Sequence, residues 1–231
     1  MLKLIKTSVI GPAHISENLP NQDAVGHFIN KNHWAIIVCD GMGSKAHADV
    51  GADVAVRSIK ATLRRSEFDA AARSVISGFY QLWLDMLKQL GIRPNDAVTT
   101  VLIVWGNHQG NFRTFQLGDG VISTASRVIT PFSNDEFSNL TTGLGLSKKL
   151  SDWVISEGIL SNKDKGILLA SDGVSEDVTD HCAFIQALIA YSHRKSARRV
   201  KKHLKSMLIN WPTPHHTDDK SLNMVILDDK K

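Results

Sequence analysis

Two short apolar runs of the chain end at the same dipeptide, Asp-Gly. Residues 34–40 are rich in β-branched side chains and contain no Pro, a pattern typical of a buried strand rather than a helix. Residues 166–171 repeat this pattern, and the chain then turns at Asp172 and Gly173. A carboxylate held at the end of a buried strand is well placed for a hard cation. Asp-Gly alone is also one of the commonest turn dipeptides, so a plain turn stays open for each site.

The remaining apolar pattern predicts a sheet-rich fold. Further strands are expected at residues 2–10, 24–29, 99–105, 111–117, 121–126 and 223–227. Between residues 99 and 126 the strands alternate with Gly-containing turns and no helix intervenes, which predicts an antiparallel meander. Residues 11–21 are rich in Gly, Pro and Asn, so we expect a loop there.

Three segments have helical spacing of apolar residues. Residues 47–63 and 66–90 are expected to pack on a sheet, and Ser66 to Asp69 of the second segment resemble a capping box. Residues 192–210 combine many bases with a narrow apolar stripe, which predicts an amphipathic helix.

A third carboxylate, Asp219, lies shortly before the apolar run 223–227. Asp40, Asp172 and Asp219 can converge only if their strands pack together. A converged acidic cluster repels itself unless cations occupy it. Ligand sets made only of oxygen atoms favour Mg²⁺ or Mn²⁺ over zinc.

Six short motifs together resemble a known family. They are Asn21-Gln22-Asp23, Asp40-Gly41-Met42-Gly43, Thr99-Thr100, Leu117-Gly118-Asp119-Gly120, Ala170-Ser171-Asp172-Gly173 and Asp218-Asp219. Their order and their strand contexts are similar to those of the bacterial metal-dependent Ser/Thr protein phosphatases of the 2C type. The similarity runs from about Ser8 to Leu227.

The resemblance implies an α+β fold in which two packed, mainly antiparallel sheets are flanked by helices. It implies one phosphatase domain over residues 1–231, with a flap within residues 130–165. That span is polar and rich in turns, so a plain surface excursion is the alternative to a flap.

The resemblance also implies a metal-dependent hydrolysis of phosphoserine and phosphothreonine in proteins. Asp40, the Gly41 carbonyl, Asp172 and Asp219 would hold two Mn²⁺ or Mg²⁺ ions, and a hydroxide that bridges them would attack the phosphorus.

The resemblance places further residues around these ligands. Asp23 and Asp119 would orient metal-bound waters, and Asp119 with Glu176 could hold a third ion. Judged alone, Asp119 is equally consistent with an ordinary hairpin turn.

The chain departs from the family pattern at the phosphate-binding position. The family carries an Arg in the segment before Asp23, but residues 8–23 contain neither Arg nor Lys. His14 or Lys45 could partly replace it, although for His14 an ordinary loop histidine is the favoured interpretation, because an unperturbed His is mostly neutral at pH 7. This departure leaves open a second function, a catalytically weak phosphatase-like regulator that binds a phosphoprotein or another partner.

Composition limits the remaining choices. At 231 residues and 42% apolar content, the chain can bury one sizeable core. Cys39 and Cys182 form no metal-ligand spacing, and no signal peptide or membrane span is visible, so we expect a cytoplasmic protein. The sequence does not predict an oligomeric state.

The expected partners are phosphorylated proteins, including a cognate Ser/Thr kinase. The bases of residues 192–210 account for much of the isoelectric point near 9.1 and are expected to face water. Nucleic acid is not favoured as a partner, because the segment lacks interleaved aromatic residues or a recognisable binding motif.

Overall fold

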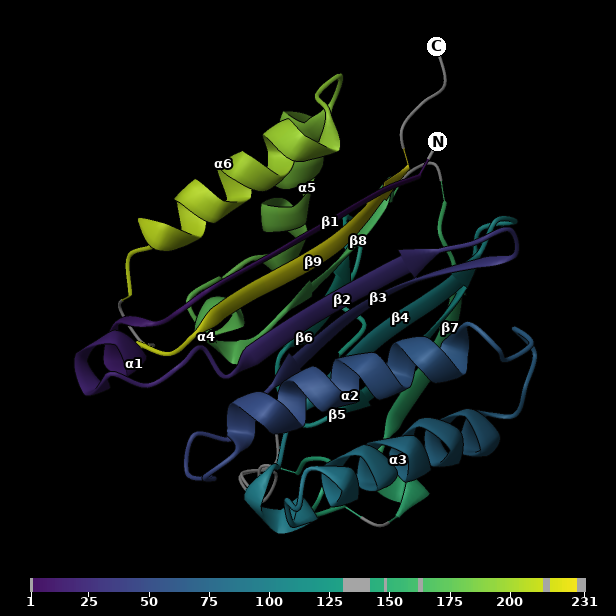
Figure 1. Ribbon diagram of the computed structural model, residues 1–231. Helices are drawn as coiled ribbons and strands as arrows, with labels where there is room; N and C mark the ends of the chain where they lie inside the picture. The colour runs from purple at the N-terminus through teal and green to yellow at the C-terminus, as the bar shows by residue number, and fades with distance from the viewer. Residues whose placement is uncertain (1, 131–141, 148, 162–163, 214–216, 228–231) are drawn as a thin grey trace.

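Two antiparallel sheets packed face to face form the centre of the computed structural model (Figure 1). The structure describes all residues except 1, 131–141, 148, 162–163, 214–216 and 228–231. The first sheet has the strand order β1 (Leu2–Val9), β9 (Lys220–Leu227), β8 (Gly166–Ala170) and β6 (Val121–Thr124). The second has the order β2 (Asp23–Ile29), β3 (His33–Asp40), β4 (Val101–Asn107), β5 (Asn111–Leu117) and β7 (Val154–Ile159).

Helices cover both outer faces of the sandwich (Figure 1). The first sheet is covered by α5 (His181–Ser192) and α6 (Ala197–Ile209), and the second by α2 (Ala48–Leu63) and α3 (Ala72–Gln89). Shorter elements are α1 (Pro12–Glu17), α4 (Asp172–Ser175) and the 3₁₀ turns Pro94–Asp96 and Leu150–Asp152. This arrangement confirms the predicted fold class.

The strand β3 is apolar along its whole length because both of its faces are buried. Trp34, Ile36 and Val38 contact the core between the two sheets. Ala35 and Ile37 alternate with them and pack in the core beneath α2 and α3. A central strand covered on both sides reads as a continuous apolar run.

The strand predicted at residues 121–126 is shorter, and it does not extend the meander. The two preceding strands, β4 and β5, are neighbours in the second sheet, but β6 pairs with β8 in the first sheet. Gly118 and Gly120, with φ of 87° and 90°, turn the chain from one sheet to the other. Strand spacing alone does not distinguish this crossing from a hairpin.

The capping box predicted at Ser66 is wrong. The Ser66 hydroxyl donates to the Thr62 carbonyl oxygen at 3.0 Å, so it closes the end of α2. The next helix begins only at Ala72, and Ala71 before it makes no side-chain capping bond. The last predicted helix is also shorter than expected, because Ser192 ends α5 and Ser196 caps α6 by accepting from the Arg199 amide.

Several elements were missing from the predicted set, among them α1, α4, α5 and β7. The segment 11–21, expected as a loop, contains the short helix α1, whose first residue is Pro12. Proline suits that position because its fixed φ matches a helix and its missing N–H needs no partner. The strand β7 lies within residues 130–165; it is half exposed at a sheet edge, which weakens its apolar pattern.

No helix in the described part of the chain is long and apolar enough to cross a membrane.

Candidate active site

A cavity of about 170 Å³ lies where β3 and β8 end. Four aspartates from separate parts of the chain line it, Asp40, Asp119, Asp172 and Asp218. The rest of its wall consists of Gly41, Met42, Gly43, Val98, Thr99, Thr100, Thr142 and Gly143. Both sheets therefore contribute to this carboxylate cavity.

The backbone of Asp40 is fixed by two threonines that precede β4. The Thr100 amide and the Thr99 hydroxyl both donate to the Asp40 carbonyl oxygen, at 2.7 and 2.9 Å. The Asp40 amide donates to Thr100 Oγ1 at 3.0 Å. The Thr-Thr pair of the sequence thus holds the end of β3 rather than contributing a nucleophile.

Asp23 lies directly opposite Asp40 in the pairing of β2 with β3. Burial raises the pKa of Asp23 to about 8, and the charges of Asp219 and Asp172 act in the same direction. Hydroxyl groups act against this rise, and the Ser171 hydroxyl donates to Asp23 Oδ2 at 3.0 Å.

The pKa of Asp40 is also well above its usual range, because of burial first and then the charges of Asp23 and Asp172. The cluster is therefore destabilised by its own negative charge unless a cation is present.

Both Asp-Gly turns need their glycine. A Cβ on Gly41 would collide with the Ala48 carbonyl group at the start of α2. A Cβ on Gly173 would collide with the Asp219 carbonyl oxygen. The glycines allow the two strand ends to approach neighbouring backbone closely, which brings Asp40 and Asp172 to one cavity.

Asp119 is carried by the Gly-Asp-Gly turn between β5 and β6. A Cβ on Gly118 would contact the Thr142 carbonyl oxygen at 2.6 Å, and one on Gly120 would contact the Ala170 carbonyl oxygen at 2.8 Å. This turn is thus wedged between residues 142–143 and the end of β8. It is more than an ordinary exposed hairpin turn.

The structure separates the two adjacent aspartates before β9. The Asp219 side chain is only 2% exposed, and its carboxylate accepts from the Gly11 amide at 2.7 Å and the Gln22 amide at 2.5 Å. Asp219 does not line the carboxylate cavity, whereas Asp218, whose side chain is 40% exposed, does. Asp219, predicted as a metal ligand, instead ties the ends of the 11–22 segment to β9.

Four other predicted site residues lie outside the cavity wall: Asp23, described above, and His14, Glu176 and Lys45. His14 is buried, and its Nδ1 is 2.9 Å from Asp219 Oδ2 and 3.7 Å from Asp218 Oδ1. Glu176 is exposed just after α4, and Lys45 follows the Asp40 turn without reaching the lining. The structure therefore brings together Asp40, Gly41, Asp119 and Asp172 of the predicted set.

Sequence reasoning missed Lys220, the first residue of β9. Its side chain is fully buried, and Nζ donates to the Asp218 carbonyl oxygen at 2.8 Å. Burial lowers the pKa of Lys220, while Asp177 and Asp218 oppose that effect. A lysine directly after an Asp pair and ahead of an apolar strand was the available signal. Lys220 holds the backbone that carries Asp218.

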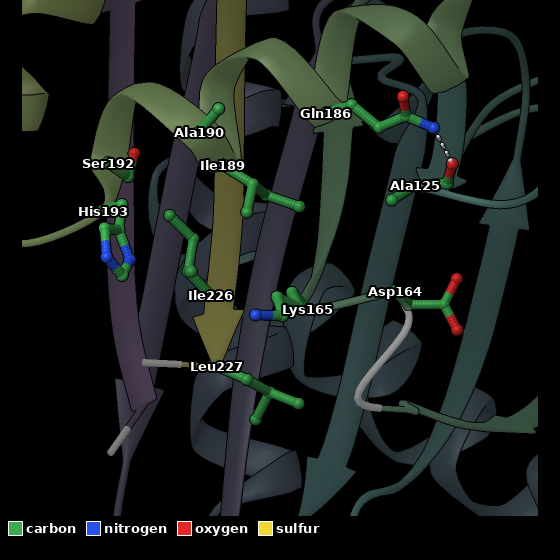
Figure 2. A pocket seen from close by; sticks show the side chains of 10 residues that line it. All are labelled: Ala125, Asp164, Lys165, Gln186, Ile189, Ala190, Ser192, His193, Ile226 and Leu227. Carbon is green, nitrogen blue, oxygen red and sulfur yellow. Dashed lines mark hydrogen bonds between the residues drawn. The ribbon is translucent and has the colours of Figure 1, made fainter. Parts of the chain in front are cut away.

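A second cavity, of about 240 Å³, lies at the opposite end of β8 (Figure 2). It is bounded by Ile189 of α5, Ile226 and Leu227 of β9 and Lys165. Gln186, beside it, donates to the Ala125 carbonyl oxygen at 2.6 Å. Asp164 accepts from the hydroxyls of Ser126 and Ser161. Asp164, the one carboxylate among the described residues of this wall, is thus already hydrogen-bonded, so we do not place catalysis here.

The donor atoms that could hold a metal are almost all oxygen atoms. Besides the carboxylates of the cavity, potential ligand atoms of His14, Asp218 and Asp219 lie within 4.8 Å of one another. Such a set suits Mg²⁺ or Mn²⁺, and a cation there would relieve the repulsion that raises the pKa of Asp40.

This chain belongs to the protein phosphatase 2C family, whose model matches residues 10–209. The match confirms the family resemblance of the sequence. Members of such a family act on phosphorylated proteins. Among curated proteins, no significant match was found.

Solved structures of bacterial phosphatases share the fold. The serine/threonine phosphatase Stp1 from Staphylococcus aureus is 18% identical with a TM-score of 0.71, covering 99% of this chain and 96% of its own. The catalytic domain of the serine/threonine phosphatase PstP, in complex with two manganese ions, is 15% identical with a TM-score of 0.71 and 99% coverage of both chains. RsbX in complex with magnesium is 14% identical with a TM-score of 0.63, covering 98% of this chain and 96% of its own.

Proposed function

We propose that this protein removes phosphate from phosphoserine and phosphothreonine side chains of other proteins in a metal-dependent hydrolysis. The observation that carries the proposal is the carboxylate cavity, where Asp40, Asp119, Asp172 and Asp218 meet at the strand ends of both sheets. The family of the chain supports a protein substrate.

Two Mn²⁺ or Mg²⁺ ions would be held by Asp40, the Gly41 carbonyl, Asp172 and Asp218. Asp218 takes the place predicted for Asp219, because Asp219 already accepts from two backbone amides. The proposal draws support from PstP, whose structure contains two manganese ions. When bound, such ions lower the pKa of a water and neutralise charge on the phosphoryl oxygens.

The side chains of this protein hold and orient the reactants. The described wall of the cavity contains no His, Cys, Lys or Arg, so attack and leaving-group protonation fall to water. Asp119 faces the cavity, and Asp23 is held behind Asp40 by the Ser171 hydroxyl. Both would orient water molecules by accepting hydrogen bonds. Asp119 with Glu176, which is exposed after α4, remains the proposed pair for a third ion.

His14 has a different proposed role from binding substrate phosphate. Its Nδ1 is 2.9 Å from the Asp219 carboxylate, which in turn accepts from the Gly11 and Gln22 amides. His14 therefore fixes the segment that leads to Asp23. Lys45 remains a proposed phosphate-binding residue, since it lies two residues after Gly43 of the cavity wall.

The proposed substrates include a cognate Ser/Thr kinase, and the proposed location is the cytoplasm. Phosphorylated kinases are natural substrates for an enzyme that reverses their reaction. Part of the flap proposed within residues 130–165, namely residues 131–141, 148 and 162–163, lies outside the described residues. Of its described part, Thr142 and Gly143 line the cavity.

Hydrolysis of a phosphothreonine peptide tests this function. The purified protein would be assayed with Mn²⁺, with Mg²⁺ and with excess chelator, beside Asp40→Asn and the exposed control Asp85→Asn. Metal-dependent release of phosphate that Asp40→Asn alone abolishes would support the proposal.

The second candidate is a weak phosphatase-like regulator that binds phosphoproteins. It is favoured by the absence of a cationic side chain from the described cavity wall. No turnover with either metal, from folded protein that still binds the phosphopeptide, would favour this candidate.

A further inference from the structure

The edge strands β1 and β2 lie next to each other between α2 and α6 (Figure 1). β1 pairs only with β9, and β2 pairs only with β3, so each leaves one side without a strand partner. Four basic side chains gather here, one from each neighbouring element. These are Lys6 of β1, His27 of β2, Lys60 of α2 and Lys201 of α6, and we call them the basic edge.

Direct contacts fix two of these side chains. Lys6 Nζ donates to the Val25 carbonyl oxygen of β2 at 2.7 Å, across the gap between the two sheets. The stem of Lys60 lies over β2, since its Cδ would be 3.2 Å from a Cβ on Gly26. The absence of a side chain at Gly26 leaves space for Val56, whose Cγ1 would collide with such a Cβ, and lets the Lys60 stem pass beside it. Lys201 is exposed on α6, which packs against β1.

The four groups influence one another. Burial lowers the pKa of His27 to about 4, and Lys6, Lys60 and Lys201 act in the same direction. Lys60 and Lys201 also lower the pKa of Lys6, after burial. In addition, His27 Nδ1 is buried without a hydrogen-bond partner among the described residues. Positive charge is therefore concentrated at this edge.

Little acidic charge compensates the basic edge. Asp53 acts on Lys6, but its carboxylate pairs with Arg57, one turn further along α2. The sequence contains no Asp or Glu between residues 181 and 217, so α6 supplies only positive charge. Among the described residues, no acidic side chain forms a salt bridge with Lys60 or Lys201.

We propose that the basic edge binds an acidic segment of the phosphoprotein substrate, at a distance from the phosphorylated residue. This inference rests on the proposed phosphatase function and names a class of substrate for it. Three lysines from three elements present a positive surface with little acidic compensation, and carboxylates are the groups that complement it.

One extended peptide is long enough to reach from the end of β2 that carries Asp23 to the basic edge. His27 follows Asp23 by four residues along β2, and a strand rises about 3.3 Å per residue, so the basic edge lies roughly 13 Å along β2 from the end that carries Asp23. An extended substrate spans that distance in about four residues. We therefore expect acidic residues from about the fourth position away from the phosphorylated residue.

A protein segment is a better occupant than nucleic acid. The substrate of the proposed reaction is already a protein chain held nearby. None of the large hydrophobic side chains exposed in the described residues is aromatic, so no stacking platform for bases accompanies the lysines.

The test compares two phosphothreonine peptides. Each carries six added residues that begin four positions from the phosphothreonine, all Glu in one peptide and all Gln in the other. Both peptides would be made in two versions, with the six residues on the N-terminal or on the C-terminal side of the phosphothreonine. Specificity constants with Mn²⁺ would be measured for the wild type and for Lys60→Gln/Lys201→Gln. The control is Lys31→Gln/Lys88→Gln, which removes the same charge from exposed positions elsewhere.

We expect the wild type to favour one Glu peptide by about threefold to tenfold at 50 mM salt, mainly through KM. The edge variant should lose this preference and keep its turnover of p-nitrophenyl phosphate, while the control variant keeps both. Equal specificity constants for Glu and Gln peptides in the wild type would overturn the proposal. So would a preference that the edge variant retains.

A binding measurement separates this proposal from the proposed function. Fluorescence anisotropy of the labelled Glu peptide without phosphate reports on the basic edge even if the protein hydrolyses nothing. Loss of binding in the edge variant alone supports the proposal. Peptide binding that Lys60→Gln/Lys201→Gln leaves unchanged contradicts the proposal. If a DNA duplex binds more tightly through the same lysines, with a steep dependence on salt, the basic edge is a nucleic-acid site instead.

Discussion

The carboxylate cavity and the basic edge gather charges of opposite sign, and strand β2 runs from one to the other. At one end of β2, Asp23 faces Asp40, and burial first, then the charges of neighbouring aspartates, raises the pKa of both carboxyls. Four residues along β2, His27 lies among three lysines, and its pKa is lowered to about 4. Like charges are gathered at both places without full compensation by the protein.

This comparison distinguishes an enclosed site from an open one. The acidic groups are held by backbone contacts at strand ends, so they suit a small cation of fixed position. The lysines reach the surface from three separate elements, so they suit a flexible anionic segment. Such uncompensated charge is expected where a ligand supplies the missing charge.

The largest effect is expected from removing a charge inside the carboxylate cavity. Asp40→Asn should lower the specificity constant for a phosphothreonine peptide on the order of a thousandfold, because a proposed ligand of both ions is lost. Steady-state assays with Mn²⁺ measure this. Asp85→Asn, on the exposed face of α3, should remain within twofold, and full activity of Asp40→Asn would remove Asp40 from the mechanism.

Adding metal should reverse the order of thermal stability of the wild type and Asp40→Asn. With chelator, Asp40→Asn should be more stable than the wild type, because it relieves the repulsion with Asp23 and Asp172. With Mn²⁺ at a hundred times its dissociation constant, the wild type should gain about 2.7 kcal/mol, a rise of roughly 5 to 10 °C in Tm. The variant should gain much less. Equal gains in both proteins would contradict a metal site at Asp40.

Asp219 should matter for folding more than for chemistry. Asp219→Ala leaves the buried amides of Gly11 and Gln22 without their acceptor, so we expect a loss of about 2 to 4 kcal/mol in the free energy of unfolding. Urea denaturation with chelator measures this loss. Asp218→Ala, at a half-exposed side chain, should lose less than half as much.

The smallest effect concerns pH at the basic edge. Because the pKa of His27 is lower in the folded state than in the unfolded chain, the unfolded chain binds more protons between pH 6.5 and 4. Stability from this group therefore falls as pH falls through that range. After allowance for solvent screening, the wild type should lose about 1 kcal/mol more than His27→Gln between pH 7 and 4.5.

Denaturation at several pH values measures the His27 effect, and NMR titration of the ring sharpens it. Lys60→Gln/Lys201→Gln should raise the pKa of His27 toward its ordinary value. An unchanged pKa would show that burial alone lowers it and that the lysines are too far away to act.

The apolar pattern was sufficient for most strands because the sandwich buries both faces of its central strands. The run 34–40 and the run 166–171 correspond to β3 and β8 within one residue. The pattern failed where burial is partial, as in β7, and where glycines carry the chain between sheets, as after β5.

The order of the motifs was sufficient to predict four residues that line one cavity, but it could not distinguish between two adjacent aspartates. Asp218 and Asp219 are equivalent in a linear motif. Only the fold shows that the amides of Gly11 and Gln22 donate hydrogen bonds to the Asp219 carboxylate. The same holds for His14, whose contact with Asp219 joins residues about 200 positions apart. The basic edge was equally hidden, since its four members come from four elements.

Turnover by the matched pair Asp218→Asn and Asp219→Asn tests the central claim most directly, that the acidic residues lining the carboxylate cavity carry the reaction. Both substitutions remove one negative charge from adjacent positions, and both proteins would be assayed on a phosphothreonine peptide with saturating Mn²⁺ at pH 7. We predict that Asp218→Asn loses turnover by at least a hundredfold, while folded Asp219→Asn stays within about fivefold of the wild type. Loss of turnover in Asp219→Asn with full activity in Asp218→Asn would contradict the account.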